Sequence, residues 1–128
     1  EHVVDGSSMR SLLLGKADPS RSEQFLMHYP HGQHRSNYFT VWRDGDWKVV
    51  YHALPSEKTT GGFLQTKDGH YQLFNLREDP FESTNLVASR PNELKRMMKA
   101  MIEQLEQHEA VYPVDQDGNA LRPQLPKE

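Results

Sequence analysis

The chain has 128 residues, a formal net charge of -3, no cysteine and a hydrophobic share of 35%, which fits one small domain with a thin core that a neighbouring domain completes. The missing cysteines exclude a disulfide framework, a thiol nucleophile and a thiolate metal site, and no apolar run approaches the roughly 18 residues that a membrane span needs. The charge gives no support to nucleic-acid binding, because the sequence has no basic stripe interleaved with aromatic residues.

The first part of the chain predicts a leading segment and one strand. Residues 1–23 are polar and rich in turn formers, so at most one short helical turn is expected there. Gln24–Tyr29 is a compact run stopped by Pro30, and it predicts a strand because proline cannot continue a central ladder. A polar loop over residues 31–37 follows.

Two β-rich runs, Tyr38–Arg43 and Asp46–Tyr51, flank the dipeptide Asp44-Gly45. This arrangement predicts a hairpin with a type I′ turn, in which both turn residues have positive φ. A two-residue turn at that place sets Arg43 opposite Asp46 and Trp42 opposite Trp47. The first pair is complementary in charge and the second is aromatic, and both kinds of pair stabilise a sheet.

Both faces of this hairpin are apolar. An antiparallel hairpin in a lone small domain usually keeps one wet face, so two apolar faces indicate cover on both sides. One cover can come from the chain's own helix, and the other is expected to be missing from the chain. The faces are Tyr38, Thr40, Trp42, Trp47, Val49 and Tyr51 on one side, and Phe39, Val41, Val50 and the stem of Lys48 on the other.

The second half predicts one more strand and one long helix. Residues 55–69 form a polar insertion, Tyr71–Asn75 is a strand, and residues 76–86 are turn material. A helix is predicted from Asn92 to about Val111, with Ser89 as N-cap and Pro113 as its stop. Its methionines Met97, Met98 and Met101 are expected to be core. They belong to an apolar stripe with helical spacing: Leu94, Met97, Met98, Met101, Ile102 and Leu105.

These elements predict an α+β fold, in which an antiparallel sheet of about four strands packs on one long C-terminal helix. The expected organisation has three parts. Residues 1–23 lead in from a missing catalytic domain, residues 24–112 form the α+β subdomain, and residues 113–128 form a polar, proline-rich tail that is extended or frayed.

Three stretches, in this order, resemble the C-terminal part of the sulfatase (arylsulfatase-like) family. The first is Asp5-Gly6-Ser7-Ser8-Met9 with Leu12 to Gly15, similar to a D-G-x-S-L…L-L-x-G segment. The second is Arg43 to Val50, similar to an R-D-G-x-W-K-L-I hairpin. The third runs from Tyr71 to Leu86 and matches E-L-Y-D-L…D-P-x-E-x-x-N-L, although Gln72 stands where the family has Glu and Phe74 replaces the frequent Tyr. The resemblance covers residues 4–111.

The resemblance implies a parent enzyme that hydrolyses sulfate esters, here of sulfated carbohydrate. Such enzymes use a formylglycine and a bound calcium ion, both held in the larger catalytic domain. This chain has no recognisable motif for either group, since Ala17 stands where the Pro19-Ser20-Arg21 string would need a cysteine or serine. We therefore expect no catalytic residue, cofactor or metal ligand in this chain and no activity from it alone. Its expected role is to wall the substrate cleft and to brace the catalytic domain. Family resemblance also suggests a periplasmic or secreted parent.

His28, His31 and His34 follow an H-x-x-H-x-x-H spacing. Three interpretations stay open. The histidines are surface or packing residues, they line the substrate cleft of the full enzyme, or they ligate zinc. Pro30 excludes a regular helix there, so the spacing does not place the three rings on one face. Under the cleft interpretation the substrate-binding residues are His28, His31 and Arg35, with His31 and Arg35 contacting a sugar or sulfate oxygen.

Other candidates have simpler interpretations. Lys48 is a cation facing the cleft or a snorkelling side chain. Trp42 and Trp47 are expected to be core rather than a sugar platform. The acidic stretch Asp115 to Asn119 is expected to be a turn rather than a calcium loop, and Asp79 to Glu82 with Asn85 is expected to shape a loop.

A second function class is open as well. The chain could be a free-standing carbohydrate- or protein-binding module with an aromatic hairpin platform. An orphaned subdomain would instead expose an apolar patch or hide it by self-association. The expected partners of the subdomain are the missing N-terminal catalytic domain and sulfated carbohydrate.

Overall fold

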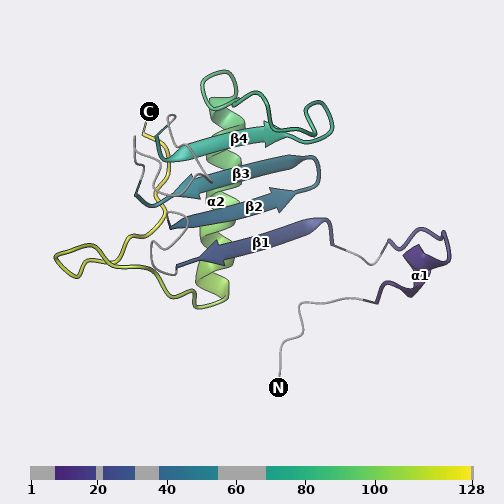
Figure 1. Cartoon of the computed structure of the whole chain (residues 1–128), viewed down its shortest axis with the longest axis horizontal. Coiled ribbons are helices and arrows are strands. Elements are labelled where there is room, and N and C mark those ends of the chain that lie inside the picture. Colours follow the sequence, from purple (N-terminus) through teal and green to yellow (C-terminus); the bar gives the residue numbers. More distant parts are fainter. Residues whose placement is uncertain (1–7, 20–21, 31–37, 55–68, 128) are drawn as a thin grey trace.

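The computed structural model of the chain describes residues 8–19, 22–30, 38–54 and 69–127. In these residues a four-stranded antiparallel sheet lies against one long helix, α2 (Pro91–Gln107), while a short helix, α1 (Arg10–Leu13), projects away from the sheet (Figure 1). The predicted α+β class is confirmed. The strands neighbour one another in chain order: β1 (Gln24–Tyr29), β2 (Phe39–Asp44), β3 (Trp47–His52) and β4 (Tyr71–Asn75).

Helix α2 supplies one half of the core, because its apolar residues recur on one side. Leu94, Met97 and Met101 are buried with Met98 and Leu105. They pack against buried side chains of the sheet, namely Trp42, Val49, Tyr51 and Leu73. The prediction that the methionine stripe is core is confirmed. Each such side chain contributes roughly 1.5–3 kcal/mol through burial, so this layer is the main source of stability.

The ends of α2 differ from the prediction. Arg90 is the N-cap rather than Ser89, and Pro91 occupies the first turn as expected. The helix ends at Gln107, well before Pro113, because Glu109 adopts a left-handed conformation with φ 50. The main-chain N–H of Glu109 then bonds the Glu106 carbonyl at 3.1 Å and that of Ala110 bonds the Leu105 carbonyl at 3.0 Å. This is a Schellman motif, which ends a helix locally without proline.

The turn between β2 and β3 is shifted by one residue from the prediction. Asp44 pairs with Trp47, so the turn residues are Gly45, at φ 58, and Asp46, which does not have positive φ. A glycine with positive φ at the first position is typical of a type II′ turn and excludes type I′. The predicted pairs Arg43–Asp46 and Trp42–Trp47 are therefore wrong. Arg43 lies opposite Lys48, and Trp42 lies opposite Val49.

Asp44 stays in the strand because its carboxylate has partners there. One oxygen accepts a hydrogen bond from the Gln24 side chain at 3.1 Å, and the other accepts one from Arg96 at 2.8 Å. Those bonds, that of Arg96 first, hold the pKa of Asp44 below its usual value. A charged partner on α2 and a polar one on β1 thus outweigh the general preference of Asp-Gly for the turn itself.

The two sheet faces are as predicted, since a two-residue slip of register preserves them. We call the face toward α2 the inner face and the opposite one the outer face. Inner rows read across β1 to β4 as Gln24–Asp44–Trp47–Asn75, Leu26–Trp42–Val49–Leu73 and His28–Thr40–Tyr51–Tyr71. Outer rows read as Phe25–Arg43–Lys48–Phe74, Met27–Val41–Val50–Gln72 and, over three strands, Tyr29–Phe39–His52.

The two edges of the sheet are treated differently. At β4, the Asn85 side chain accepts a hydrogen bond from the Leu73 N–H at 3.1 Å and donates to the Tyr71 carbonyl at 3.4 Å. The Leu86 N–H donates to the Leu73 carbonyl at 2.8 Å. The segment around Asn85 therefore closes this edge. At the other edge, β1 pairs only with β2 within the described part of the chain.

The tail after α2 is extended and returns to the sheet. Val114 and Ala120 form a β-bridge, and the Tyr71 hydroxyl donates to the Gln124 carbonyl at 3.0 Å. The Arg122 guanidinium lies 4.6 Å from the centre of the Tyr112 ring. The tail therefore contacts β4 through Gln124, and Arg122 within it makes a cation–π contact with Tyr112.

Helix α1 is the single helical turn that the sequence predicts. It has no buried residue, and its leucines lie on the surface, Leu13 being 79% exposed. Among the described residues, no helix is long and apolar enough to cross a bilayer.

Candidate functional site

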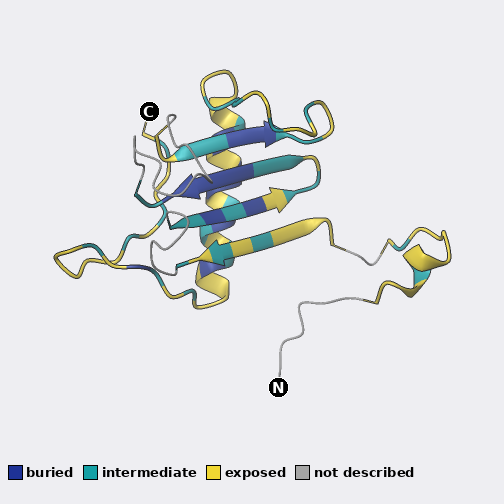
Figure 2. Ribbon diagram, in the orientation of Figure 1, coloured by how far each residue is buried: buried dark blue, intermediate teal, exposed yellow. Residues whose placement is uncertain are grey.

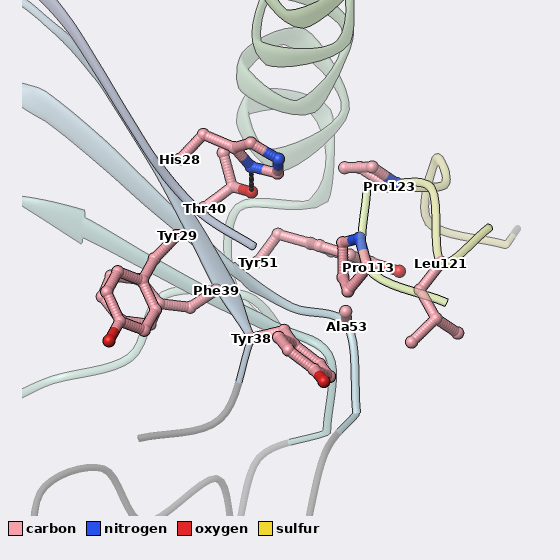
Figure 3. Close-up of a pocket in the computed structure, with 10 residues that line it drawn as sticks. All are labelled: His28, Tyr29, Tyr38, Phe39, Thr40, Tyr51, Ala53, Pro113, Leu121 and Pro123. Carbon is pink, nitrogen blue, oxygen red and sulfur yellow. Dashed lines mark hydrogen bonds between the residues drawn. The ribbon is translucent and has the colours of Figure 1, made fainter. Parts of the chain in front are cut away.

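His28 lies where β1, β2 and the tail meet (Figure 3). Its Nδ1 is 2.8 Å from the Thr40 hydroxyl, and its Nε2 is 2.8 Å from the Val111 carbonyl oxygen. A carbonyl only accepts, so Nε2 carries the proton and Nδ1 accepts from Thr40. The rings of His28 and Tyr112 also make a T-shaped contact, with their centroids 5.7 Å apart. Both ring nitrogens of His28 therefore have protein partners, and the residue holds the tail against the sheet.

The space beside His28 is small. The pocket drawn in Figure 3 has a volume of about 10 Å³, which is room for about one water molecule. Tail residues Pro113, Leu121 and Pro123 close it from one side. The remaining lining residues come from the first three strands and their ends: His28, Tyr29, Tyr38, Phe39, Thr40, Tyr51 and Ala53. A sugar ring does not fit there while the tail is in place.

Of the three predicted substrate-binding residues, His28 is the one that can be placed. His31 and Arg35 lie outside the described residues, as does His34. The structure therefore does not bring the three predicted residues together in one described site, and their role in binding substrate stays a prediction.

Lys48 is held by a carboxylate on the outer face. Its Nζ donates to both oxygens of Glu82 at 2.6 and 2.8 Å, and the two side chains are 23% and 34% exposed. Glu82 adopts positive φ, 55, which is uncommon for a residue with a side chain. From the sequence, Lys48 is a cation facing the cleft or a snorkelling residue. Neither interpretation includes its partner Glu82, on the loop after β4.

Strand β1 is mostly exposed and β3 is mostly buried, as Figure 2 shows, and the outer face follows this contrast. Over β3 and β4 it is buried, with Val50 6% and Phe74 5% exposed. Along β1 it carries an apolar strip of Phe25, Met27 and Tyr29, which are 58%, 41% and 36% exposed. We call these three residues the β1 strip. The predicted missing cover therefore concerns the β1 side and not the whole face.

His52 is a buried titratable group that sequence reasoning missed. Its side chain is fully buried at the end of the outer face, with Nε2 3.0 Å from the Gln72 side-chain oxygen. Among the residues that the structure describes, Nδ1 has no hydrogen-bond partner. Burial lowers the pKa of His52 below its ordinary value, opposed by the bond to Gln72. His70 lies close, because its Nδ1 is 2.7 Å from the His52 carbonyl. The sequence signal for this burial is the alternation of β3, because His52 comes two residues after Val50 and lies on the same face.

The tryptophans and the loop motifs behave as predicted. Trp42 belongs to the buried core and Trp47 packs against it. Asp79 accepts a hydrogen bond from the Thr84 N–H at 2.8 Å, so it shapes the loop. In the tail, one Asp115 oxygen accepts from the main-chain N–H groups of Asp117 and Asn119 at 2.9 and 2.8 Å, which makes the expected turn. The described ranges contain no group of three or more histidine, aspartate or glutamate side chains that could hold a metal ion.

A cavity of about 460 Å³ lies between β1 and the C-terminal end of α2. Its lining residues in the described part of the chain include no aspartate, glutamate, lysine or arginine. Trp42 contributes to its wall, although the indole N–H itself is buried and finds no hydrogen-bond partner within the described ranges. The lining residues are Ser22, Gln24, Phe25, Leu26, Trp42, Gln104 and His108.

Comparisons with known proteins bear on the fold. No protein-family model matches the chain, and no curated protein matches it by sequence. Among solved structures, it resembles BT4656 in complex with its substrate D-glucosamine-2-N,6-O-disulfate, with a TM-score of 0.58 and 17% sequence identity. The likeness covers 97% of this chain and 23% of that one. The chain therefore has the fold of about a quarter of a longer protein that binds a sulfated sugar.

Proposed function

We propose that the chain is the non-catalytic C-terminal subdomain of a sulfatase, a sulfuric ester hydrolase, that acts on sulfated carbohydrate. In the parent protein it walls one side of the substrate cleft and braces the catalytic domain. The observation that carries the proposal is the fold shared over 97% of the chain with part of a protein solved with a sulfated glucosamine. Because fold does not determine function, the three sequence motifs supply the second support.

The motifs correspond to structural devices in this fold. The hairpin motif places Lys48 on the outer face, where the motif glutamate, Glu82, pairs with it at 2.6 Å. The asparagine of the last motif, Asn85, closes the edge of β4. Lys48 and Glu82 thus come from two different motifs and form one ion pair. This favours a common origin of the motifs over three chance matches.

Two apolar surfaces support a docking partner in the same protein. One is the β1 strip, and the other is the leucine-rich turn α1, which projects away from the sheet (Figure 1). Exposed apolar surface of this kind marks an interaction site. A catalytic domain that packs on both would complete the thin core and fix the position of the leading segment.

The chemistry is proposed to reside in that catalytic domain. It would hold the formylglycine nucleophile and the calcium ion that neutralises the sulfate. This chain supplies packing and, through His31 and Arg35, contacts to the sugar. Under this proposal the described residues of the chain take no part in breaking the sulfate ester.

The proposal is tested on the parent protein. An antibody against this domain shows the size of the parent protein in the source. The same antibody isolates the parent protein for an assay of inorganic sulfate released from D-glucosamine-2-N,6-O-disulfate. We expect a polypeptide several times heavier than 14.8 kDa that releases sulfate, while the purified 128-residue chain releases none.

Other results would overturn it. A single band at 14.8 kDa would favour a free-standing binding module, which should then bind a carbohydrate or protein ligand as it stands. Turnover of a sulfate ester by the purified chain would contradict the non-catalytic role.

A further inference from the structure

The loop after β4, residues 76–86, is tied down by its own hydrogen bonds. The Asp79 N–H donates to the Asn75 carbonyl at 2.8 Å, and the Asp79 carboxylate accepts from the Thr84 N–H at 2.8 Å. Bonds of this local kind fix the geometry of a turn. The whole loop lies within the described range 69–127, and few other conformations are open to its backbone.

Glu82 has a strained backbone within this loop. Its φ of 55 lies in a region that few residues with a side chain adopt. Such conformations persist only where the surrounding structure enforces them, and they gather at functional sites. Lys48 of β3 enforces this one, because its Nζ donates to both carboxylate oxygens of Glu82 at 2.6 and 2.8 Å. An ion pair with the sheet thus fixes the backbone directly after Phe81.

Phe81 is 88% exposed, the largest exposed fraction of any large apolar side chain among the described residues. A single exposed apolar residue is ordinary on a protein surface, so the exposure alone indicates nothing. What distinguishes Phe81 is that a hydrogen-bonded loop and a strained, ion-paired neighbour hold its backbone in place. An aromatic side chain on so rigid a support loses little conformational entropy on binding, which is the property of an anchor residue at an interface.

Phe81 lies at one end of a surface that includes the β1 strip. In the outer row, Phe25 of the strip neighbours Arg43, which neighbours Lys48. Adjacent strands lie about 4.8 Å apart, so the row spans about 10 Å from β1 to β3. Lys48 is bonded to Glu82, the residue after Phe81. The loop lies at the same end of the sheet as the turn between β2 and β3 (Figure 1). One partner can therefore contact the β1 strip and Phe81 together.

The charges beside Phe81 indicate the chemistry of its partner. Glu78 and Asp79, three and two residues before Phe81, carry negative charge. The arginine that precedes them, Arg77, lies 3.9 Å from the Asp46 carboxylate. Complementary charges steer two surfaces together. The matching partner therefore offers an apolar pocket with lysine or arginine at its rim.

We propose that Phe81 is the anchor by which this subdomain docks on the catalytic domain of the same protein, in an apolar pocket rimmed by lysine or arginine. The inference rests on the proposed function and deepens it, because neither the β1 strip nor α1 includes this residue. Two observations favour the catalytic domain as the occupant. The surface is continuous with the β1 strip, and the fold likeness covers 97% of this chain but 23% of a longer protein, most of which lies outside the matched part.

Hydroxyl-radical footprinting of unmodified protein tests the contact. Mass spectrometry measures the oxidation rate of Phe81 in the purified 128-residue chain and in the parent protein, with a dosimeter to equalise the radical dose. We expect the rate in the parent to be lower by on the order of tenfold or more, because a covered side chain reacts only after local opening.

Phe81→Lys and Phe81→Leu provide the matched pair of variants. In the purified chain both should leave the urea midpoint unchanged, since the side chain is 88% exposed. In the parent, Phe81→Lys should speed the proteolytic release of the subdomain by on the order of tenfold, because lysine does not fill an apolar pocket and meets like charge at its rim. Phe81→Leu should recover part of the loss, since it keeps an apolar contact.

Four results would overturn the anchor: equal oxidation of Phe81 in the chain and in the parent, proteolysis that Phe81→Lys leaves unchanged, equal destabilisation of the purified chain and the parent, or oxidation that slows as the purified chain is concentrated. The third would make Phe81 a packing residue, and the fourth would make a second copy its partner. A parent that releases sulfate with Phe81 exposed contradicts the anchor and leaves the sulfatase role standing, whereas a single band at 14.8 kDa contradicts both.

Discussion

The side-chain oxygen of Asn85 accepts a hydrogen bond from the main-chain N–H of Leu73, in the middle of β4, at 3.1 Å. The same oxygen accepts from the N–H of Val87 at 3.2 Å. Leu73 is fully buried, so a neighbouring strand is replaced here by one amide. Asn85, a residue of a loop motif, therefore satisfies the main-chain N–H that a fifth strand would otherwise pair with.

Asn85→Ala should lower the free energy of unfolding by about 1–3 kcal/mol, because it leaves the Leu73 N–H buried without a partner. Urea unfolding measures the loss. Asn85→Asp keeps the acceptor oxygen and gives up the weaker bond to the Tyr71 carbonyl, so it should cost clearly less. Equal losses for the two variants would show that the acceptor is not what matters.

His28→Ala should release the tail. It removes the bonds to Thr40 and to Val111, each worth about 0.5–1.5 kcal/mol net. We expect lower stability and faster proteolysis after Val111. His28→Gln retains a donor that reaches the Val111 carbonyl and should recover part of the loss. Unchanged proteolysis in His28→Ala would mean that other contacts hold the tail.

Substitution of the loop residues should act on the substrate instead. In the parent enzyme, His31→Ala and Arg35→Ala should raise KM for a sulfated sugar, because the proposal gives both side chains contacts to the substrate. His28→Ala serves as the comparison, because it is expected to alter stability. A KM that neither loop substitution changes would remove His31 and Arg35 from the cleft.

The pair of Lys48 and Glu82 should contribute a modest, salt-dependent coupling. A double-mutant cycle with Lys48→Met and Glu82→Gln should give about 0.5–1 kcal/mol at low salt, since both side chains are partly exposed. Glu82→Gln keeps the positive φ of the loop, so the cycle isolates the charge. Roughly 1 M NaCl should reduce the coupling, and a coupling that salt leaves unchanged would contradict an ionic origin.

His52 should make the domain less stable in mild acid. Its pKa is lowered in the folded state from the ordinary value of 6.5, so below that pH the unfolded chain binds the proton more readily. Stability is then full above about pH 6.5 and falls as the pH decreases toward the lowered folded value. Urea unfolding at about pH 7.5 and about pH 5 measures the slope. His52→Phe should flatten it, whereas His108→Gln, at the exposed end of α2, should not.

The sequence predicts the fold class because its patterns are local. Alternation identifies the strands, and the stripe from Leu94 to Leu105 identifies the helix and its buried side. The hairpin register was missed because it depends on Arg96, which lies 52 residues from Asp44. The early end of α2 was missed because Glu109 adopts a conformation that glycine usually takes.

The site was harder to predict for the same reason. The spacing of His28 to other histidines indicates a cleft or a zinc site, yet its partners are a threonine on the next strand and a carbonyl of the tail. Lys48 and Glu82 are 34 residues apart in the sequence, so no local pattern indicates their ion pair. Sequence patterns report periodicity within an element, whereas these contacts arise between elements.

The sheet is built from neighbours in sequence, but its inner face is covered by a helix that comes after all four strands. During synthesis the strands therefore emerge before the side chains that bury Trp42 and Val49. The contact from His28 to Val111 spans 83 residues, and such long-range closures form slowly. The nascent strands should stay open to chaperones until the segment beyond Leu105 has left the ribosome, and a truncation before that point should yield a chain that aggregates.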